Sequence, residues 1–230
     1  MRIYSYVLRT DEGAAPNPFG EICTLTICKP AIRRTASIGD WVIGTGSKRV
    51  NLGDRKTCDF SDSLVYAMKI TEIKSLKEYD EYCNKSLTNK IPVIETENWT
   101  QKVGDCIYDY SKGDEPLIRK GVHNEGNRDR DLSGHNALLS NHFYYFGSEA
   151  RPLPPELKSI IKKNQGHKKI ENVEIIRTFE SWIEQFERNK IYADPQMCWY
   201  FDREITDEDL SVCANICKEN DSEESEESLY

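Results

Sequence analysis

The sequence has no apolar run long enough to cross a membrane. Its longest apolar stretches, such as residues 25–27 and 41–43, fall far short of the ~20 residues that a transmembrane helix needs. Arg9 interrupts the segment that would have to be the apolar core of a secretory signal, and no transit peptide is indicated. We therefore expect a cytoplasmic protein with no membrane partner.

The spacings typical of metal sites and of common catalytic motifs are also missing. The chain has eight cysteines but no CxxC pair, no HExxH and no nucleophile elbow. Zinc sites are usually built from such cysteine pairs, and disulfides form in oxidising compartments. We expect reduced, mostly buried thiols, no metal site and no cofactor.

Charge is distributed unevenly along the chain. The net charge is −8, and residues 218–230 hold six carboxylates against one lysine, whereas residues 29–56 hold seven basic residues against two acidic ones. The acidic end, rich in serine and glutamate, is typical of a disordered tail. The basic segment favours an anionic partner, although a solvated basic loop would have the same composition.

The order of expected elements indicates an α+β protein. Strands are expected at 3–8, 22–28, 41–45, 64–73, 106–110 and 137–146, with a polar, structureless loop at 120–134. Helices are expected at 76–84, capped by Ser75 and Glu78, at 156–164, at 175–186 and after Thr206. The short connections between the first strands favour a small β-barrel or a strongly bent sheet, of which we expect a PUA-like bent barrel. We expect this barrel at 1–150, a helical extension packed on it at 151–217 and the disordered tail at 218–230.

A glycine-bracketed turn, Gly44-Thr45-Gly46-Ser47-Lys48, follows the strand at 41–45. It lacks the lysine placement of a phosphate-binding P-loop and the third glycine of a dinucleotide fingerprint, so both nucleotide-cofactor motifs are excluded. Backbone amides, the Ser47 hydroxyl and the Lys48 ammonium remain suited to an anion or a base edge. An ordinary β-turn with a solvated lysine is the alternative.

The leading hypothesis is a module that binds a modified nucleic-acid base or nucleotide, with the base stacked on aromatic rings. Arginines would hold the phosphates, and the turn after the strand would contact the edge of the base. The candidate residues are Trp41, Tyr144 and Phe146 for stacking, Thr45, Ser47 and Lys48 for the base edge, and Arg33, Arg34, Arg49 and Arg55 for the phosphates.

Two other classes of function remain open. A hydrolase or transferase acting on a modified nucleotide or base would use Lys48, with Asp40 or His135 as the proton carrier. Of the four histidines, His135 is the best candidate because it follows the long loop, and His123 is expected at the surface. Alternatively, the loop Lys120–Gly134 would contact a protein partner.

Several unusual strings resemble, in order, the bacterial and phage family called nucleotide modification associated domain 2. The strings lie at 4–7, 15–19, 23–30, 32–36, 39–48 and 143–147, and the resemblance covers about residues 1–200. It implies an association with DNA base modification or phage defence, and it brings no catalytic residues with it. The chain is more loosely similar to the EVE and ASCH members of the PUA-like superfamily, which implies a barrel that binds a modified base. It lacks the GxKxxExR string of ASCH domains.

Overall fold

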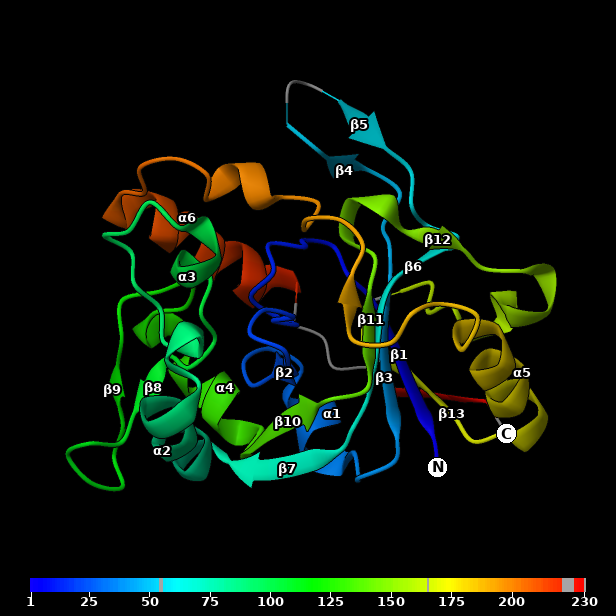
Figure 1. Cartoon of the computed structure of the whole chain (residues 1–230), viewed down its shortest axis with the longest axis horizontal. Coiled ribbons are helices and arrows are strands. Elements are labelled where there is room, and N and C mark those ends of the chain that lie inside the picture. The colour runs from blue at the N-terminus through cyan, green and yellow to red at the C-terminus, as the bar shows by residue number, and fades with distance from the viewer. Residues whose placement is uncertain (54–55, 165, 221–225, 230) are drawn as a thin grey trace.

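The computed structural model describes residues 1–53, 56–164, 166–220 and 226–229 (Figure 1). Its strands are β1 (Ile3–Val7), β2 (Cys23–Leu25), β3 (Trp41–Thr45), β4 (Val50–Asn51), β5 (Thr57–Cys58), β6 (Ser63–Lys69), β7 (Glu72–Ser75), β8 (Tyr108–Asp109), β9 (Leu117–Ile118), β10 (Asn136–Ser140), β11 (Phe143–Tyr145), β12 (Arg151–Pro152), β13 (His167–Ile170), β14 (Lys190–Ile191) and β15 (Glu226–Leu229). Its α-helices are α1 (Pro30–Thr35), α2 (Leu76–Ser86), α3 (Trp99–Lys102), α4 (Arg128–Ser133), α5 (Val173–Ile183) and α6 (Asp207–Asn220).

The main sheet is mixed and open. Among the described residues it has the order β14-β11-β6-β3-β1-β13-β15, with β12 also paired to β6. Strands β1 and β3 run parallel, from Ile3 opposite Trp41 to Val7 opposite Thr45, and β3 and β6 run antiparallel. In the part of the chain that the structure describes, no pairing joins the edge strands β14 and β15. Strands and helices therefore mix as the sequence predicts, but the described strands do not close into a barrel, and a PUA-like arrangement is not confirmed.

Both faces of the main sheet are covered, which explains why its central strands are apolar on both sides. Helix α5 packs on one face through Ile176, Phe179 and Ile183. The other face packs on α1, β2 and β10, and a second lobe with α2, α3, α4 and α6 lies beyond them (Figure 1). The molecule thus has a sheet-and-helix body and a lobe, with the smaller sheet β2-β10-β7 between them.

Two segments that the sequence predicts as single long strands each bend into two. The segment 64–73 becomes β6 and β7, and the segment 137–146 becomes β10 and β11. Strands β6 and β11 pair in the main sheet, whereas β7 and β10 pair in the smaller sheet. At the bend, the Ser140 hydroxyl donates to the carbonyl of Lys69. Periodicity alone does not show such a bend, because the chain stays extended and apolar on both sides of it.

Helix α2 begins where the sequence predicts. The Ser75 hydroxyl accepts from the Glu78 backbone N–H, and the Glu78 carboxylate accepts from the Ser75 N–H, which completes the capping box. Helix α5 is also confirmed, with Asn172 as its N-cap. The helix expected at 156–164 is instead a 3-10 helix, η4 (Pro155–Ile160).

The segment 120–134 is not a structureless loop. Asn124 caps a 3-10 turn, η2 (Glu125–Asn127), and α4 follows it directly. Val122, His123 and Asp131 in this segment are buried, so the expectation that His123 lies at the surface is wrong. The two helices are short and the first begins at a polar cap, so the sequence lacks the apolar periodicity by which longer helices are predicted.

Residues beyond 150 do more than form helices. They also supply β12, β13 and β14 to the main sheet, which already includes strands from the first 150 residues. Within the expected tail, α6 continues to Asn220 and β15 pairs in parallel with β13. Helical and extended elements therefore occupy part of the segment 218–230.

Candidate functional site

A pocket of about 650 Å³ lies where the parallel strands β1 and β3 end. Residues 8–10 after β1 and 46–48 after β3 line it, together with residues 27–29, 122–123, 158 and 161–164 from elsewhere in the chain. The carboxyl ends of parallel strands are a common place for ligands, because the loops that follow them diverge there. The volume falls within the range of sites for small molecules.

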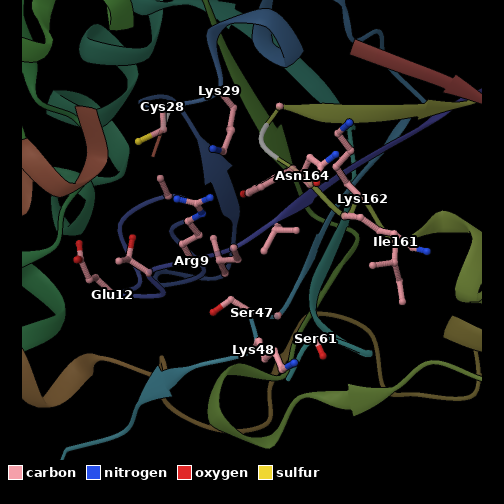
Figure 2. Close-up of a pocket in the computed structure, with 18 of the residues that line it drawn as sticks. Arg9, Glu12, Cys28, Lys29, Ser47, Lys48, Ser61, Ile161, Lys162 and Asn164 are labelled. Atoms are coloured by element: carbon pink, nitrogen blue, oxygen red, sulfur yellow. The ribbon is translucent and has the colours of Figure 1, made fainter. Parts of the chain in front are cut away.

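Among the charged side chains that line this pocket in the described part of the chain, most are basic. The basic ones are Arg9, Lys29, Lys48, Lys158, Lys162 and Lys163, against the carboxylates of Glu12 and Asp62. Asp62 forms an ion pair with Lys158 at 2.8 Å, and the Lys29 ammonium lies 4.9 Å from the centre of the Tyr6 ring. Figure 2 shows Arg9 in the middle of the pocket, with Lys48 and Lys162 on different sides of it. This excess of positive charge attracts anions.

At one end of the pocket, a cysteine, a histidine and an aspartate form a chain of contacts. The Cys28 Sγ lies 3.4 Å from the His123 Nε2, and the His123 Nδ1 lies 2.5 Å from the Asp131 Oδ2. Cys28 and His123 line the pocket, at 8% and 3% exposure, while Asp131 is fully buried behind them. A thiol beside an imidazole whose second nitrogen is held by a carboxylate is the arrangement of an activated nucleophile.

The backbone around Cys28 is held in an unusual conformation. Cys28 and Lys29 have φ angles of 56° and 42°, in the left-handed region that non-glycine residues rarely adopt. The Asp131 Oδ1 accepts from the Cys28 N–H at 2.9 Å, and the Arg33 Nε donates to the Cys28 carbonyl at 2.8 Å. These contacts fix the turn between β2 and α1, where Cys28 lies.

Burial and charge together shift the pKa values at this end of the pocket. Desolvation lowers the pKa of His123, but the charges of Asp131 and Cys28 outweigh it and hold this pKa well above its usual value. Desolvation raises the pKa of Asp131, but the His123 charge outweighs it and lowers that pKa. Burial, aided by Cys28, raises the pKa of Glu12 to about 7. This end of the pocket thus combines the His123–Asp131 ion pair with the carboxyl group of Glu12, which titrates near neutral pH.

The glycine-bracketed turn contributes two of its expected residues to the pocket, Ser47 and Lys48. Thr45 is buried, and its hydroxyl donates to the Tyr6 carbonyl at 3.2 Å, so it does not face a ligand. A Cβ at Gly46 would lie 2.6 Å from the carbonyl oxygen of Phe60. Close backbone packing therefore accounts for this glycine without an anion.

The aromatic candidates lie in the core and away from this pocket. Trp41 is fully buried, lies nearly parallel to Tyr144 with 6.3 Å between ring centres, and donates from its Nε1 to Glu180 on α5. Phe146 packs against Phe186 on the same face of the sheet. Trp41 begins β3 and Lys48 follows its other end, and extended backbone separates such residues by about 20 Å. Trp41 therefore lies far from Lys48, and none of the three candidate rings lines the pocket.

The candidate proton carriers also lie elsewhere. Asp40 is buried at the start of β3, where it forms an ion pair with Arg2 at 2.8 Å and accepts from the Ser37 N–H. His135 is exposed in the turn before β10, with a φ of 58° and its carbonyl accepting from the Leu76 N–H. The contacts of Asp40 and His135 hold the local backbone in place, and neither residue lines the pocket.

The candidate arginines have different environments. Arg33 is fully buried and donates to three backbone carbonyls, those of Cys28, Asp131 and Asn136, so it is not placed to hold a phosphate. Arg34 is exposed and donates to Ser133 on α4. Arg49 is exposed after the turn but does not line the pocket, and Arg55 lies outside the described residues.

Sequence reasoning missed Cys28, His123, Asp131 and Glu12. No short motif joins them, because they lie up to 119 positions apart in the chain. The only local signal is a cysteine immediately before Lys29-Pro30, where proline suits the first turn of a helix. With eight cysteines and four histidines in the chain, spacing alone does not select this pair.

Two further observations concern the described part of the chain. No group of three or more histidine, cysteine and acidic side chains there has the arrangement of a metal site. None of its helices combines the length and the apolar character that spanning a bilayer requires.

Comparison with known protein families gives a match over most of the chain. The family model described as nucleotide modification associated domain 2 matches residues 1–203, which include every segment that lines the pocket. The chain matches no curated protein and no solved structure. Since the match covers most of the chain, the protein belongs to the nucleotide modification associated domain 2 family.

Proposed function

We propose that the pocket at the ends of β1 and β3 binds a nucleotide, free or within a nucleic acid, whose base is modified or is to be modified. The observation that carries this proposal is the excess of basic side chains around a cavity of about 650 Å³. The family of the chain links it to nucleic-acid modification. Of the residues expected from the sequence, Ser47 and Lys48 line this pocket, and the three aromatic rings do not.

The charges favour a ligand that carries a phosphate. Lys48 and Lys163 are exposed side chains at the pocket, suited to meet a phosphate that retains part of its hydration. Lys162, at 5% exposure, places a buried positive charge in the same wall. Positive charges around a cavity attract an anion into it. A neutral nucleoside gains none of this attraction.

Isothermal titration calorimetry tests the proposal with the four deoxynucleoside 5′-monophosphates and the matching nucleosides. We expect at least one monophosphate to bind more tightly than its nucleoside, and binding to weaken as salt is raised. The double substitution Lys48→Ala with Lys163→Ala should lower affinity at least about fivefold, since a charged hydrogen bond contributes ~1 kcal/mol or more.

Lys112→Ala is the matched control, because Lys112 is an exposed lysine outside the pocket. It should leave affinity unchanged. Equal binding of nucleotides and nucleosides, or equal losses in the double variant and the control, would refute the proposal.

A further inference from the structure

We infer that Cys28, His123 and Asp131 form a nucleophilic catalytic site that attacks an acyl-type carbon, a carbonyl or amidine carbon, on the base of the bound nucleotide or on a substituent of that base. The nucleophile is argued from geometry alone, whereas the substrate class rests on the proposed function. Cys28 would be the nucleophile, His123 the acid and base, and Asp131 a positioning residue.

The contacts assign these roles. The His123 Nε2 lies 3.4 Å from the Cys28 sulfur, within reach of its proton. The His123 Nδ1 faces Asp131, so the ring is oriented with its other nitrogen toward the thiol. Asp131 is itself fixed by the Tyr108 hydroxyl at 2.8 Å and by the Cys28 N–H. A thiolate paired with an imidazolium is the reactive form of a cysteine nucleophile.

The strained backbone is a second, independent observation. Two consecutive non-glycine residues, Cys28 and Lys29, adopt the left-handed conformation in the turn between β2 and α1. Non-glycine residues in this conformation are strained, and strain of this kind concentrates at functional sites. A sharp turn between a strand and a helix is also where α/β-hydrolases expose their nucleophile, which is an analogy of geometry only.

The pocket separates the nucleophile from much of the basic wall. Figure 2 shows Glu12 and Cys28 toward one end, away from Lys48 and Lys162. A nucleotide with its phosphate near these lysines would direct its base toward the cysteine. The reacting atom is therefore expected on the base or its substituent, and the phosphate would serve for binding.

The reaction balances with water as the second reactant. The Cys28 thiolate bonds to the substrate carbon, and the π electron pair of C=O or C=N moves onto the heteroatom. When the double bond re-forms, an amine or alcohol leaves with the proton that His123 carries. Water then adds to the carbon of the thioester or thioimidate, gives one proton to His123, and the C–S bond breaks to restore the thiolate.

Other charged groups around the cysteine bear on its titration. Glu12 lines the same pocket, and its pKa of about 7 lets it donate a proton to the heteroatom at neutral pH. Lys29 and Arg9 line the pocket as well, and their positive charges favour the thiolate and a developing negative charge on the substrate. Arg33 contributes a fixed positive charge behind the turn.

The test measures alkylation of each cysteine by iodoacetamide as a function of pH, using peptide mass spectrometry. Cys28 should react well below the ordinary thiol pKa of ~8.5, because alkylation follows the thiolate. Cys198 is the reference in the same sample, since it is partly buried and its pKa is raised by desolvation. His123→Gln should lower the rate of Cys28 at pH 6 at least about tenfold, as one pKa unit corresponds to a tenfold change in thiolate.

Asp131→Asn should shift the pH profile of Cys28 upward, as expected for a positioning residue. If this variant does not fold, the wild-type profile and His123→Gln still decide the question. The assignment of Cys28 as the nucleophile would be overturned if its alkylation in the wild type followed the pKa of an ordinary or buried thiol. It would also be overturned if His123→Gln left the pH profile of alkylation unchanged.

Protection experiments separate this inference from the proposed function. Deoxynucleoside monophosphates should slow alkylation of Cys28 and leave Cys198 unaffected. Fast alkylation that depends on His123 but is not slowed by any of the four would support the nucleophile and count against the nucleotide pocket. Tight nucleotide binding that depends on Lys48, combined with the pH profile of an ordinary thiol at Cys28, would support the nucleotide pocket. It would overturn the assignment of Cys28 as the nucleophile.

Discussion

Arg33 shows how one residue can carry a different role from the one its sequence context favours. It lies in the basic segment 29–56, yet its guanidinium is buried and donates to the backbone carbonyls of Cys28 and Asp131. It thereby connects the turn that bears the thiol to the helix that bears the carboxylate. A planar group with several donors suits this task better than an ammonium does.

Arg33→Met is expected to lower the free energy of unfolding by about 3 kcal/mol, because three buried carbonyls lose their donor. Arg34→Ala, at the neighbouring exposed position, is expected to cost less than about 1 kcal/mol. Urea unfolding followed by circular dichroism measures both. Similar costs for the two variants would contradict the bracing role of Arg33.

Trp41 packs in the core of the protein, and we expect it to make no contact with the ligand. Trp41→Phe is expected to destabilise the protein by about 1–2 kcal/mol, since it removes the hydrogen bond to Glu180 and part of a packed ring. Nucleotide affinity, measured by calorimetry, should stay the same because Trp41 lies at the opposite end of β3 from Lys48. A loss of affinity in a stably folded variant would return Trp41 to the binding site.

At the scale of the element, local rules decide where helices begin. The capping box of α2 satisfies two backbone N–H groups that otherwise have no partner at a helix start. The same reasoning explains α5, where the Asn172 side chain accepts from the N–H groups of Glu174 and Ile175. Such signals are visible in sequence because they act over only three or four residues.

Ser75→Ala should cost ~1 kcal/mol of unfolding free energy, the usual effect of removing an N-cap. Glu78→Gln is the matched variant, because the amide oxygen can still accept from the Ser75 N–H. It should cost clearly less in the same thermal or urea experiment. If both variants leave stability unchanged, the cap does not contribute to the folded state.

At the scale of the molecule, buried acids make stability depend on pH. Burial raises the pKa of Asp11 to about 6 and that of Glu12 to about 7. A carboxyl group with a raised pKa in the folded state takes up a proton on folding. Its contribution to the free energy of unfolding is therefore full below its unfolded pKa of ~4 and is lost as pH rises toward its folded pKa. The raised pKa of His123 acts in the same direction, as its contribution is lost when pH rises through the folded pKa. The pKa of Asp131 is lowered in the folded state, so Asp131 stabilises the fold above pH ~4 and this stabilisation is lost only in acid.

The free energy of unfolding should therefore fall between pH 5 and pH 8, on the order of 4 kcal/mol. Glu12→Gln should reduce this fall and should be more stable than the wild type at pH 8, because it removes the buried charge. Urea unfolding at several pH values measures the effect. A stability that rises over this range would contradict the raised pKa values.

Much of the architecture was readable from the sequence because it depends on local patterns. Alternating and apolar runs located β1 and β3, a capping box located α2, and one amphipathic stripe located α5. The ordered strings at 4–48 and 143–147 likewise indicated the family that the comparison confirms. These features require only neighbouring residues or residues on one helix face.

The site was decided by tertiary structure. Cys28, His123 and Asp131 meet only because the turn before α1 packs against the segment that leads into α4, and Lys48 joins the same pocket only because β1 and β3 run parallel. The open sheet was also decided at this level, where two strands bend from one sheet into the other. Contacts between distant segments depend on how buried surfaces fit together, and no spacing along the chain encodes that fit.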